Sequence, residues 1–300
     1  MIENLSHGRR EVLFRAPEVF SKIVGIHKFY VEVHGIPLCF HVSQKELIAK
    51  LADYFPKTWQ KTNKKAFHVH WKSPENFTDR PIEEWDNISD PNCIFMNEWV
   101  SQRDFVVQRL PDKQVNLIAK EEIDDGFFNF LRYFLPYELL FQNKILFHSS
   151  CVVDKKEEAF LFFGHSGAGK STISKLCSEG NILGDDMNLL TIHPNVIFVE
   201  SAAVGQRFYS KENFGTKYVV ENAFWLEKSK FIKAEPLVNK RVSLLLSSFT
   251  GLFWDQLSEK DYLKVFQLAQ LLNKNLGLYN LEFSLDKKVW NYVRKFNANL

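Results

Sequence analysis

The sequence has few cysteines, almost no net charge and no long apolar segment. Its four cysteines lie far apart and form no C-x-x-C pair, which argues against a zinc ribbon or a disulfide framework and fits reduced, buried thiols in the cytoplasm. Lys and Arg number 38 against 36 Asp and Glu, a net charge of +2, so no nucleic-acid partner is expected from overall charge. The most apolar stretch, residues 242–254, is too short to span a bilayer, and the N-terminus lacks the apolar region of a signal peptide. We therefore expect a cytoplasmic protein with neither a membrane nor a nucleic-acid partner.

The 300 residues suggest two domains. Residues 1–120 are expected to form an α+β domain, because short apolar runs alternate with turn residues and one amphipathic helix. The expected elements are a hairpin at 28–42, a helix at 43–57, strands at 66–71, 93–100, 104–110 and 114–120, and a proline-containing loop at 73–92. His68 and His70 share one face of a strand, as zinc ligands would, but with no third ligand beside them a structural role is favoured.

Residues 121–300 are expected to form an α/β domain of alternating strands and helices. A helix at 123–142, kinked by Pro136, precedes strands at 144–153 and 157–163 and a helix that ends at Gly180. Residues 223–233 carry alternating charges and are interpreted as an exposed edge strand. A helix, a strand and a last helix at 258–275, 278–285 and 287–296 complete the domain or form an oligomer contact, so a homo-oligomer is left open.

A complete G-x-x-x-x-G-K-[ST] phosphate loop (Walker A motif) follows the strand at 157–163 and opens a helix. Its glycines let backbone N–H groups converge on phosphate oxygens, and the start of the helix adds partial positive charge. Lys170 is expected to reach the β- and γ-phosphates, and the Ser171 hydroxyl to bind Mg²⁺. The predicted nucleotide-binding residues are Gly164, His165, Ser166, Gly167, Ala168, Gly169, Lys170, Ser171 and Thr172.

Two adjacent carboxylates, Asp185 and Asp186, follow the loop helix in the segment 181–190. Beside a phosphate loop, one acid can bind Mg²⁺ and the other can accept a proton from an attacking hydroxyl. Asp185 is expected to be the metal ligand, although which acid has which role is open, and Gly184-Asp185-Asp186 would also suit a plain turn. We favour the functional interpretation, because metal sites gather carboxylates.

His148 lies near the middle of the strand at 144–153, one strand before the loop strand. Sequential strands are commonly neighbours in a sheet, which would bring His148 close to the γ-phosphate. There it could bind metal or orient the acid pair, whereas an isolated strand histidine is otherwise structural. His148, Lys170, Asp185 and Asp186 are the expected catalytic residues.

The three segments FHSSCVV, FFGHSGAGKST and ILGDD together resemble the catalytic domain of the HPr kinase/phosphorylase superfamily and its HPr-kinase-like relatives. The fold of that superfamily is shared with phosphoenolpyruvate carboxykinase. The resemblance covers roughly residues 135–235. It implies ATP and Mg²⁺ as cofactors and phosphate transfer to a serine-type hydroxyl of a peptide, protein or small molecule, with the residue roles given above.

Residues 207–241 are rich in Lys and Arg, and phosphoryl transfer uses cationic groups to hold the moving charge. Arg207 and Lys211, in a glycine-bounded loop, are the candidates for a phosphate or acceptor clamp, although a solvated loop explains them as well. The sequence therefore predicts a serine-type kinase whose first 120 residues help to recognise the acceptor. An ATP-binding switch or scaffold without phosphotransfer is the alternative, and a carboxykinase is expected least, since no carboxylate-binding arginine is evident near the loop.

Overall fold

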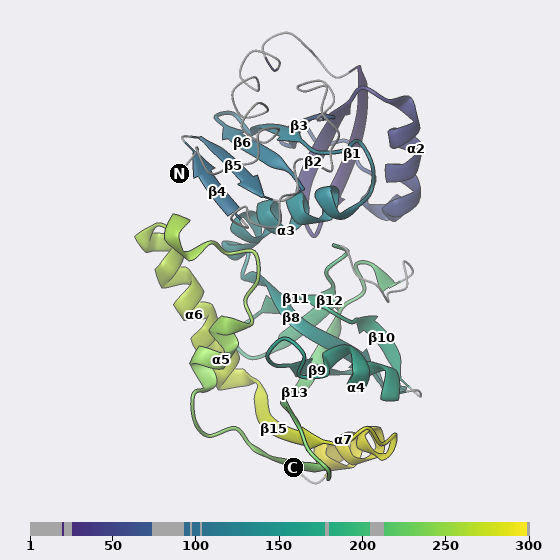
Figure 1. The fold of residues 1–300 in the computed structure, drawn as a ribbon, viewed down its shortest axis with the longest axis vertical. Helices are drawn as coiled ribbons and strands as arrows, with labels where there is room; N and C mark the ends of the chain where they lie inside the picture. Colours follow the sequence, from purple (N-terminus) through teal and green to yellow (C-terminus); the bar gives the residue numbers. More distant parts are fainter. Residues whose placement is uncertain are drawn as a thin grey trace. The chain divides into compact units, whose positions relative to one another are not determined.

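The computed structural model describes residues 20, 26–73, 93–96, 98–102, 104–177, 180–204 and 213–298. The chain divides into two compact units, Met1–Leu131 and Arg132–Leu300. The boundary expected after residue 120 from sequence falls shortly before the helix α3 (Asp125–Leu140), which contains this division. Each unit has its own sheet (Figure 1).

The N-terminal unit contains a seven-stranded mixed sheet in the order β1-β2-β3-β7-β6-β5-β4. Its strands are β1 His27–Val33, β2 Ile36–Val42, β3 Phe67–Lys72, β4 Cys93–Met96, β5 Trp99–Gln102, β6 Val106–Leu110 and β7 Gln114–Ile118. The expected hairpin is confirmed as the antiparallel pair β1–β2, turning at His34 and Gly35. The single strand expected at 93–100 is wrong, because β4 and β5 form a second antiparallel hairpin there.

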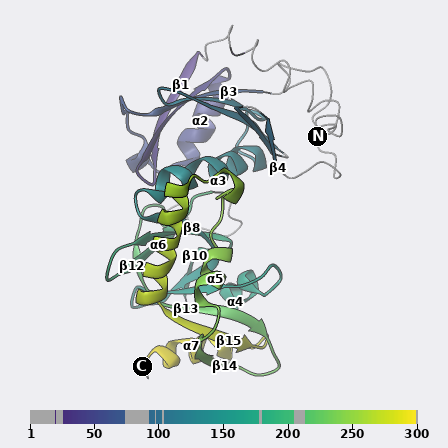
Figure 2. The same ribbon diagram turned by 90° about the vertical axis from the view of Figure 1, so that its left-hand side faces the viewer.

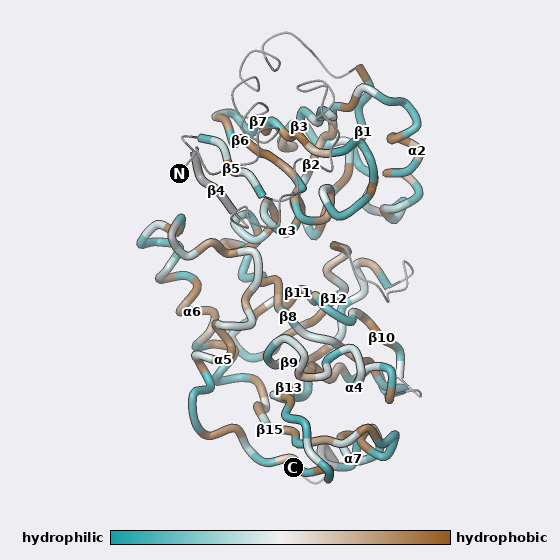
Figure 3. The backbone as a smooth tube through the Cα atoms, viewed as in Figure 1, coloured by the Kyte–Doolittle hydropathy of each residue, from teal (hydrophilic) through white to brown (hydrophobic). Residues whose placement is uncertain are grey.

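The helices of the N-terminal unit pack their apolar sides against one face of this sheet (Figure 2). They are α2 (Lys45–Tyr54), a short 3-10 turn η2 (Lys57–Trp59) and the first two turns of α3. Leu47, Leu51 and Tyr54 of α2 recur at helical spacing and are buried on one side of the helix. Figure 3 shows the alternation of apolar and polar positions along this helix. Phe127 of α3 is fully buried, and its ring lies 5.2 Å from Trp71 and 5.8 Å from Phe40.

The C-terminal unit contains an eight-stranded mixed sheet in which β8 and β13 are the central strands. β9, β13 and β15 are parallel to one another, whereas β8 pairs antiparallel with β9, β10 and β11. The strands are β8 Lys144–Val153, β9 Glu158–Phe163, β10 Asn181–Gly184, β11 Met187–Ile192, β12 Ile197–Ser201, β13 Tyr218–Lys228, β14 Lys233–Pro236 and β15 Gly277–Phe283. The sheet is thus α/β with mixed pairing, and not the regular alternation of strand and helix that the sequence suggests.

Helices cover both faces of the central strands and enclose two apolar clusters. The helices are α4 Lys170–Leu176, α5 Arg241–Ser247, α6 Glu259–Asn275 and α7 Lys288–Ala298, with a 3-10 turn η6 at Trp254–Gln256. Ser258 begins α6 with a capping box to Asp261. The last strand and helix complete this domain, because β15 joins the sheet and Val289, Trp290 and Val293 of α7 are buried in one cluster. No helix among the described residues is long and apolar enough to cross a membrane.

The expectation of an exposed edge strand at 223–233 is wrong. β13 lies inside the sheet, paired with β9 and β15 along the same residues, and Ala223–Leu226 are buried. The charges that suggested an edge, Glu227 and Lys228, stand at the exposed end of the strand. A strand between parallel neighbours is covered on both faces and therefore loses the alternating pattern that sequence analysis looks for.

We predict that Phe127→Ala lowers the free energy of unfolding by about 3–5 kcal/mol, because it leaves a cavity between Trp71 and Phe40. Urea denaturation followed by circular dichroism measures the loss. Phe128→Ala is the matched control on the same helix, where the ring is only partly buried, and a smaller loss is expected. Equal losses for the two variants would contradict the packing described here.

Candidate functional site

The candidate site forms where β8 exchanges hydrogen bonds on both of its edges. On one edge Ser149 pairs with Phe163, so the phosphate loop, which starts at Gly164, leaves β9 next to His148. On the other edge Gly184 pairs with Cys151 and Met187 with His148. Asp185 and Asp186 interrupt this second ladder between β10 and β11. The expected adjacency of the two sequential strands is confirmed.

The phosphate loop runs from the end of β9 to the start of α4. Gly167 and Gly169 have φ angles of +77° and +106°, which disfavour any residue with a side chain. At Gly169 a Cβ would also lie 2.8 Å from the Phe283 ring of β15, whereas at Gly167 it would meet open space. His165, Ser166 and Gly167 are exposed, as are Ser171 and Thr172 at the beginning of the helix. The loop therefore presents its backbone to solvent, as a phosphate-binding loop must.

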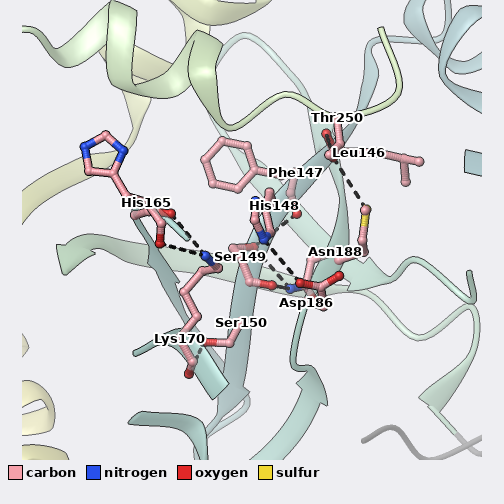
Figure 4. Close-up of polar contacts among 12 residues, drawn as sticks. Leu146, Phe147, His148, Ser149, Ser150, His165, Lys170, Asp186, Asn188 and Thr250 are labelled. Atoms are coloured by element: carbon pink, nitrogen blue, oxygen red, sulfur yellow. Dashed lines mark hydrogen bonds and ion pairs between the residues drawn. The ribbon is translucent and has the colours of Figure 1, made fainter. Parts of the chain in front are cut away.

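Lys170 is the buried cation of this loop. Its Nζ donates hydrogen bonds to the carbonyl oxygens of Gly164, at 3.1 Å, and His165, at 3.2 Å (Figure 4). Burial lowers the pKa of Lys170, and the charge of Asp186 opposes that shift. The two carbonyl oxygens are neutral acceptors. An anionic group that entered the loop would therefore form a stronger hydrogen bond with the Lys170 ammonium than these carbonyls do.

Two buried hydroxyls fix the start of α4 to the sheet. The Ser150 and Ser174 hydroxyls each donate to the carbonyl oxygen of Lys170 at 2.9 Å. Ser150 is fully buried on β8. Because one of these hydroxyls comes from the strand and the other from the next turn of the helix, the backbone of Lys170 is held in place from two directions.

His148 and Asp186 form an ion pair beside the loop, with 3.2 Å between Nε2 and Oδ1 (Figure 4). The hydrogen bond from His148 lowers the pKa of the Asp186 carboxyl, and the charges of Arg132 and Lys170 lower it further, against the effect of burial. Both side chains are partly exposed. The site thus holds one accessible carboxylate among three basic groups.

The two adjacent acids have different surroundings. Asp185 is only 3% exposed, whereas the Asp186 side chain is 46% exposed and faces His148. Next to them Asn188 donates to the carbonyl oxygen of Ser149 at 2.7 Å, which ties β11 to β8 below the pair. The structure therefore brings the partly exposed His148 and Asp186 together beside the buried Lys170, and it places Asp185 in the interior.

Arg132 on α3 is a site residue that the sequence analysis missed. Its charge acts on Asp186, and its guanidinium donates to the carbonyl oxygen of Val204, at 3.2 Å from Nη2. It stands in a phenylalanine-rich helix far from the motifs in sequence, and such a helix gives no signal of a polar site. The proposed clamp residues Arg207 and Lys211 lie outside the described residues.

A glycine-rich loop between a strand and a helix, with a buried lysine and a nearby carboxylate, defines an α/β nucleotide-binding fold built on a mixed sheet. Residues 62–201 match the family model described as phosphoenolpyruvate carboxykinase. This segment includes the phosphate loop, His148, Asp185 and Asp186.

Curated relatives agree with this match. The chain is 40% identical over 65 residues to phosphoenolpyruvate carboxykinase (ATP) from Campylobacter jejuni strain RM1221, which is 22% of this chain and 12% of that protein. The same enzyme from Campylobacter lari and from Sulfurimonas denitrificans is also 40% identical over 65 residues, or 22% of this chain, with 12% and 11% of those proteins covered. The similarity thus spans about an eighth of the length of these relatives.

These matches correct three expectations from the sequence. The predicted serine-type hydroxyl kinase, the HPr-kinase-like enzyme class and the peptide or protein acceptor are wrong, because family model and relatives alike are phosphoenolpyruvate carboxykinases. The error arose because the phosphate loop, His148 and the acid pair lie in a fold that both groups share. What stands is the carboxykinase-like nucleotide-binding fold.

We predict that His148→Ala raises the pKa of Asp186, because it removes the hydrogen bond that chiefly lowers it. The carboxyl chemical shift of Asp186, followed by NMR against pH, measures the change. In the wild type the pair stabilises the folded state fully at pH values above the ordinary aspartate pKa of about 3.9. This contribution is lost as the pH falls through the lower pKa that Asp186 has in the folded protein.

The exposed His193, whose ring contacts Phe198, provides the control His193→Ala. It is expected to leave the Asp186 titration unchanged. An unchanged midpoint in His148→Ala would show that the ion pair does not form in solution.

Proposed function

We propose that this chain binds ATP with Mg²⁺ and transfers the γ-phosphoryl group in the manner of phosphoenolpyruvate carboxykinase. The observation that carries the proposal is the grouping of Lys170, His148 and Asp186 around the phosphate loop, inside the segment that matches the carboxykinase family model. The acceptor is then the enolate oxygen of a small oxo acid. A relation to HPr kinase is retained only at the level of the fold.

The phosphate loop supplies the ATP site in this proposal. Backbone N–H groups around Gly167 and Gly169 surround the phosphates, and Lys170 exchanges its carbonyl partners for β- and γ-phosphate oxygens. Ser150 and Ser174 hold the backbone of Lys170 during this exchange, so only its side chain has to move.

The residues of the site fit a magnesium ion. Mg²⁺ prefers oxygen ligands and is commonly held by one or two carboxylates together with substrate phosphates. The exposed hydroxyl of Ser171 and the accessible carboxylate of Asp186 are such ligands. Asp185, which precedes Asp186 in the chain, is buried. When bound, the ion would neutralise charge on the phosphates.

The carboxykinase reaction needs no base at the acceptor. In the direction from oxaloacetate, the bond to the departing carboxylate breaks, carbon dioxide leaves and its electron pair forms the enolate. The enolate oxygen then attacks the γ-phosphorus, and the bond to the bridging oxygen of ADP breaks. Since no hydroxyl proton has to be removed, the His148–Asp186 pair is assigned to charge and metal binding and not to proton abstraction.

Arg132 is assigned to the acceptor. A planar guanidinium binds carboxylates through paired hydrogen bonds, and the charge of Arg132 already reaches Asp186. From the sequence, a carboxykinase was expected least because no carboxylate-binding arginine was evident near the loop. In the proposed function Arg132 is that arginine. The participation of the first 120 residues in acceptor recognition remains part of the proposal, as does the cytoplasmic location that the buried free thiols of Cys151 and Cys177 favour.

The decisive experiment supplies γ-labelled ATP and Mg²⁺ with oxaloacetate. We expect labelled phosphoenolpyruvate and ADP in equal amounts, and the reverse reaction from phosphoenolpyruvate, ADP and carbon dioxide supplied as bicarbonate. Serine-containing peptides in parallel reactions are expected to stay unlabelled. ATP binding without transfer in either direction would refute the proposed function.

A second prediction concerns the buried lysine. Lys170→Met is expected to lower kcat by about 100- to 1,000-fold, because it removes a positive charge from the developing phosphoryl charge in a buried position. Lys175→Met replaces an exposed lysine on the same short helix and serves as the control. Comparable activities of the two variants would remove Lys170 from the site.

A further inference from the structure

A second cluster of reactive side chains lies in the N-terminal unit, on the adjacent strands β2 and β3. The two strands are parallel neighbours, with Cys39 opposite His68 and His41 opposite His70. Residues two apart on a strand point to the same face, so these four side chains share one face of the sheet. The opposite face carries Phe40, which packs against the helices.

The side-chain atoms of this cluster are close enough to bind one ion. His41 Nε2 lies 2.9 Å from His68 Nδ1 and 3.5 Å from Cys39 Sγ. All three ligand atoms fall within 4.8 Å of one another. Zinc bonds of about 2.0–2.1 Å to nitrogen and 2.3 Å to sulfur place neighbouring ligand atoms of a tetrahedral site about 3.3–3.6 Å apart. The spacing of Cys39 Sγ and His41 Nε2 already fits such a site, and the nitrogens of His41 and His68 would have to separate by a few tenths of an ångström to admit the ion.

His70 is the neighbour that we take as the fourth ligand. It is not one of the three residues whose ligand atoms all lie within 4.8 Å of one another, so its ring has to move to bind the ion. Its ring centroid lies 4.6 Å from that of His41, and its Nε2 is 2.9 Å from Gln114 Oε1 on β7. An amide oxygen can only accept, so the ring proton is on Nε2 and the Nδ1 lone pair is available. Histidine ligands commonly donate their second ring N–H to an oxygen in this way, which fixes the ring for the metal.

His41 is buried between His68 and His70, whose ring centroids lie 5.2 Å and 4.6 Å from its own. Its second nitrogen, Nδ1, is buried without a hydrogen-bond partner in the part of the chain that the structure describes. The one nearby cation on β1, Lys28, is exposed and keeps its ammonium in solvent.

We propose that this face of the N-terminal sheet binds one Zn²⁺ ion through a set of ligands from two adjacent strands: Cys39, His41, His68 and His70. One thiolate with three imidazoles is a nitrogen–sulfur set that zinc accepts, whereas Mg²⁺ and Ca²⁺ prefer oxygen. The ion would link the neighbouring strands β2 and β3, which lie between β1 and β7 in the sheet. The site is independent of the phosphate loop, so its failure would leave the proposed function untouched.

In the sequence, His68 and His70 have no third ligand beside them, which favours a structural role. The other two ligands, Cys39 and His41, lie far from them in sequence and come into register only through the parallel pairing of β2 with β3. A parallel pair needs a crossover connection, here through α2, so its register cannot be read from a local motif.

Cobalt is the probe for this site, because Co²⁺ replaces Zn²⁺ and has a visible spectrum. We expect the full-length, metal-free chain to bind one Co²⁺, with strong tetrahedral ligand-field bands and a thiolate-to-cobalt charge-transfer band, and Zn²⁺ to displace it. Cys39→Ser should lose the charge-transfer band, and His68→Ala should weaken binding at least tenfold. His27→Ala, a partly buried histidine at the start of β1, is the control and should bind as the wild type does.

A milder pair of variants keeps the test valid if those two fail to fold. Gln114→Leu removes the acceptor for His70 and should weaken Co²⁺ binding about 10- to 100-fold. Gln114→Glu keeps an acceptor and should bind within a few-fold of the wild type. A wild-type spectrum without a thiolate band, or equal binding by wild type and Gln114→Leu, would overturn the proposed site.

Discussion

The candidate site depends on one strand, β8, that is paired on both edges over the same residues. Its pairing with β9 brings the start of the phosphate loop to His148, and its pairing with β10 and β11 brings Asp186 there from the other side. Neither pairing alone brings both the phosphate loop and Asp186 to His148. Because the ladder to β10 and β11 is interrupted at the two aspartates, their backbone leaves the regular pleat at this point, and Asp186 can turn to the histidine at the surface while Asp185 stays inside.

Buried polar groups around β8 make this arrangement specific. Ser149, Ser150 and Asn188 are fully buried, and each has a hydrogen bond to a backbone carbonyl oxygen of β8 or of the loop helix. A buried polar group without a partner costs roughly 1–3 kcal/mol, so a shifted register of these strands would leave several such groups unsatisfied. The network therefore favours one register, and with it one position of Lys170 relative to Asp186.

Local motifs could be predicted from the sequence, and features that depend on pairing could not. The loop, the lysine, both acids and the neighbouring strands follow from residues close together in the chain. Arg132 could not be predicted in this way, because a phenylalanine-rich helix suggests packing and not a polar site. The different burial of Asp185 and Asp186 could not be predicted either, because it arises where the strand ladder is interrupted. β13 was misread for a related reason, since parallel neighbours on both edges bury its faces and hide the alternation.

The acceptor was the most difficult feature to predict, and the reason is physical. A phosphate loop recognises phosphate through backbone N–H groups and one lysine, and these contacts are the same whatever molecule receives the phosphoryl group. The acceptor is selected by groups outside the loop, such as an arginine that neutralises a carboxylate. A hydroxyl acceptor requires a base, whereas an enolate requires only charge stabilisation, and the same His148–Asp186 pair could serve either. In the proposed function the choice between the two chemistries is assigned to residues such as Arg132, whose charge lowers the pKa of Asp186 and which no motif around the loop contains.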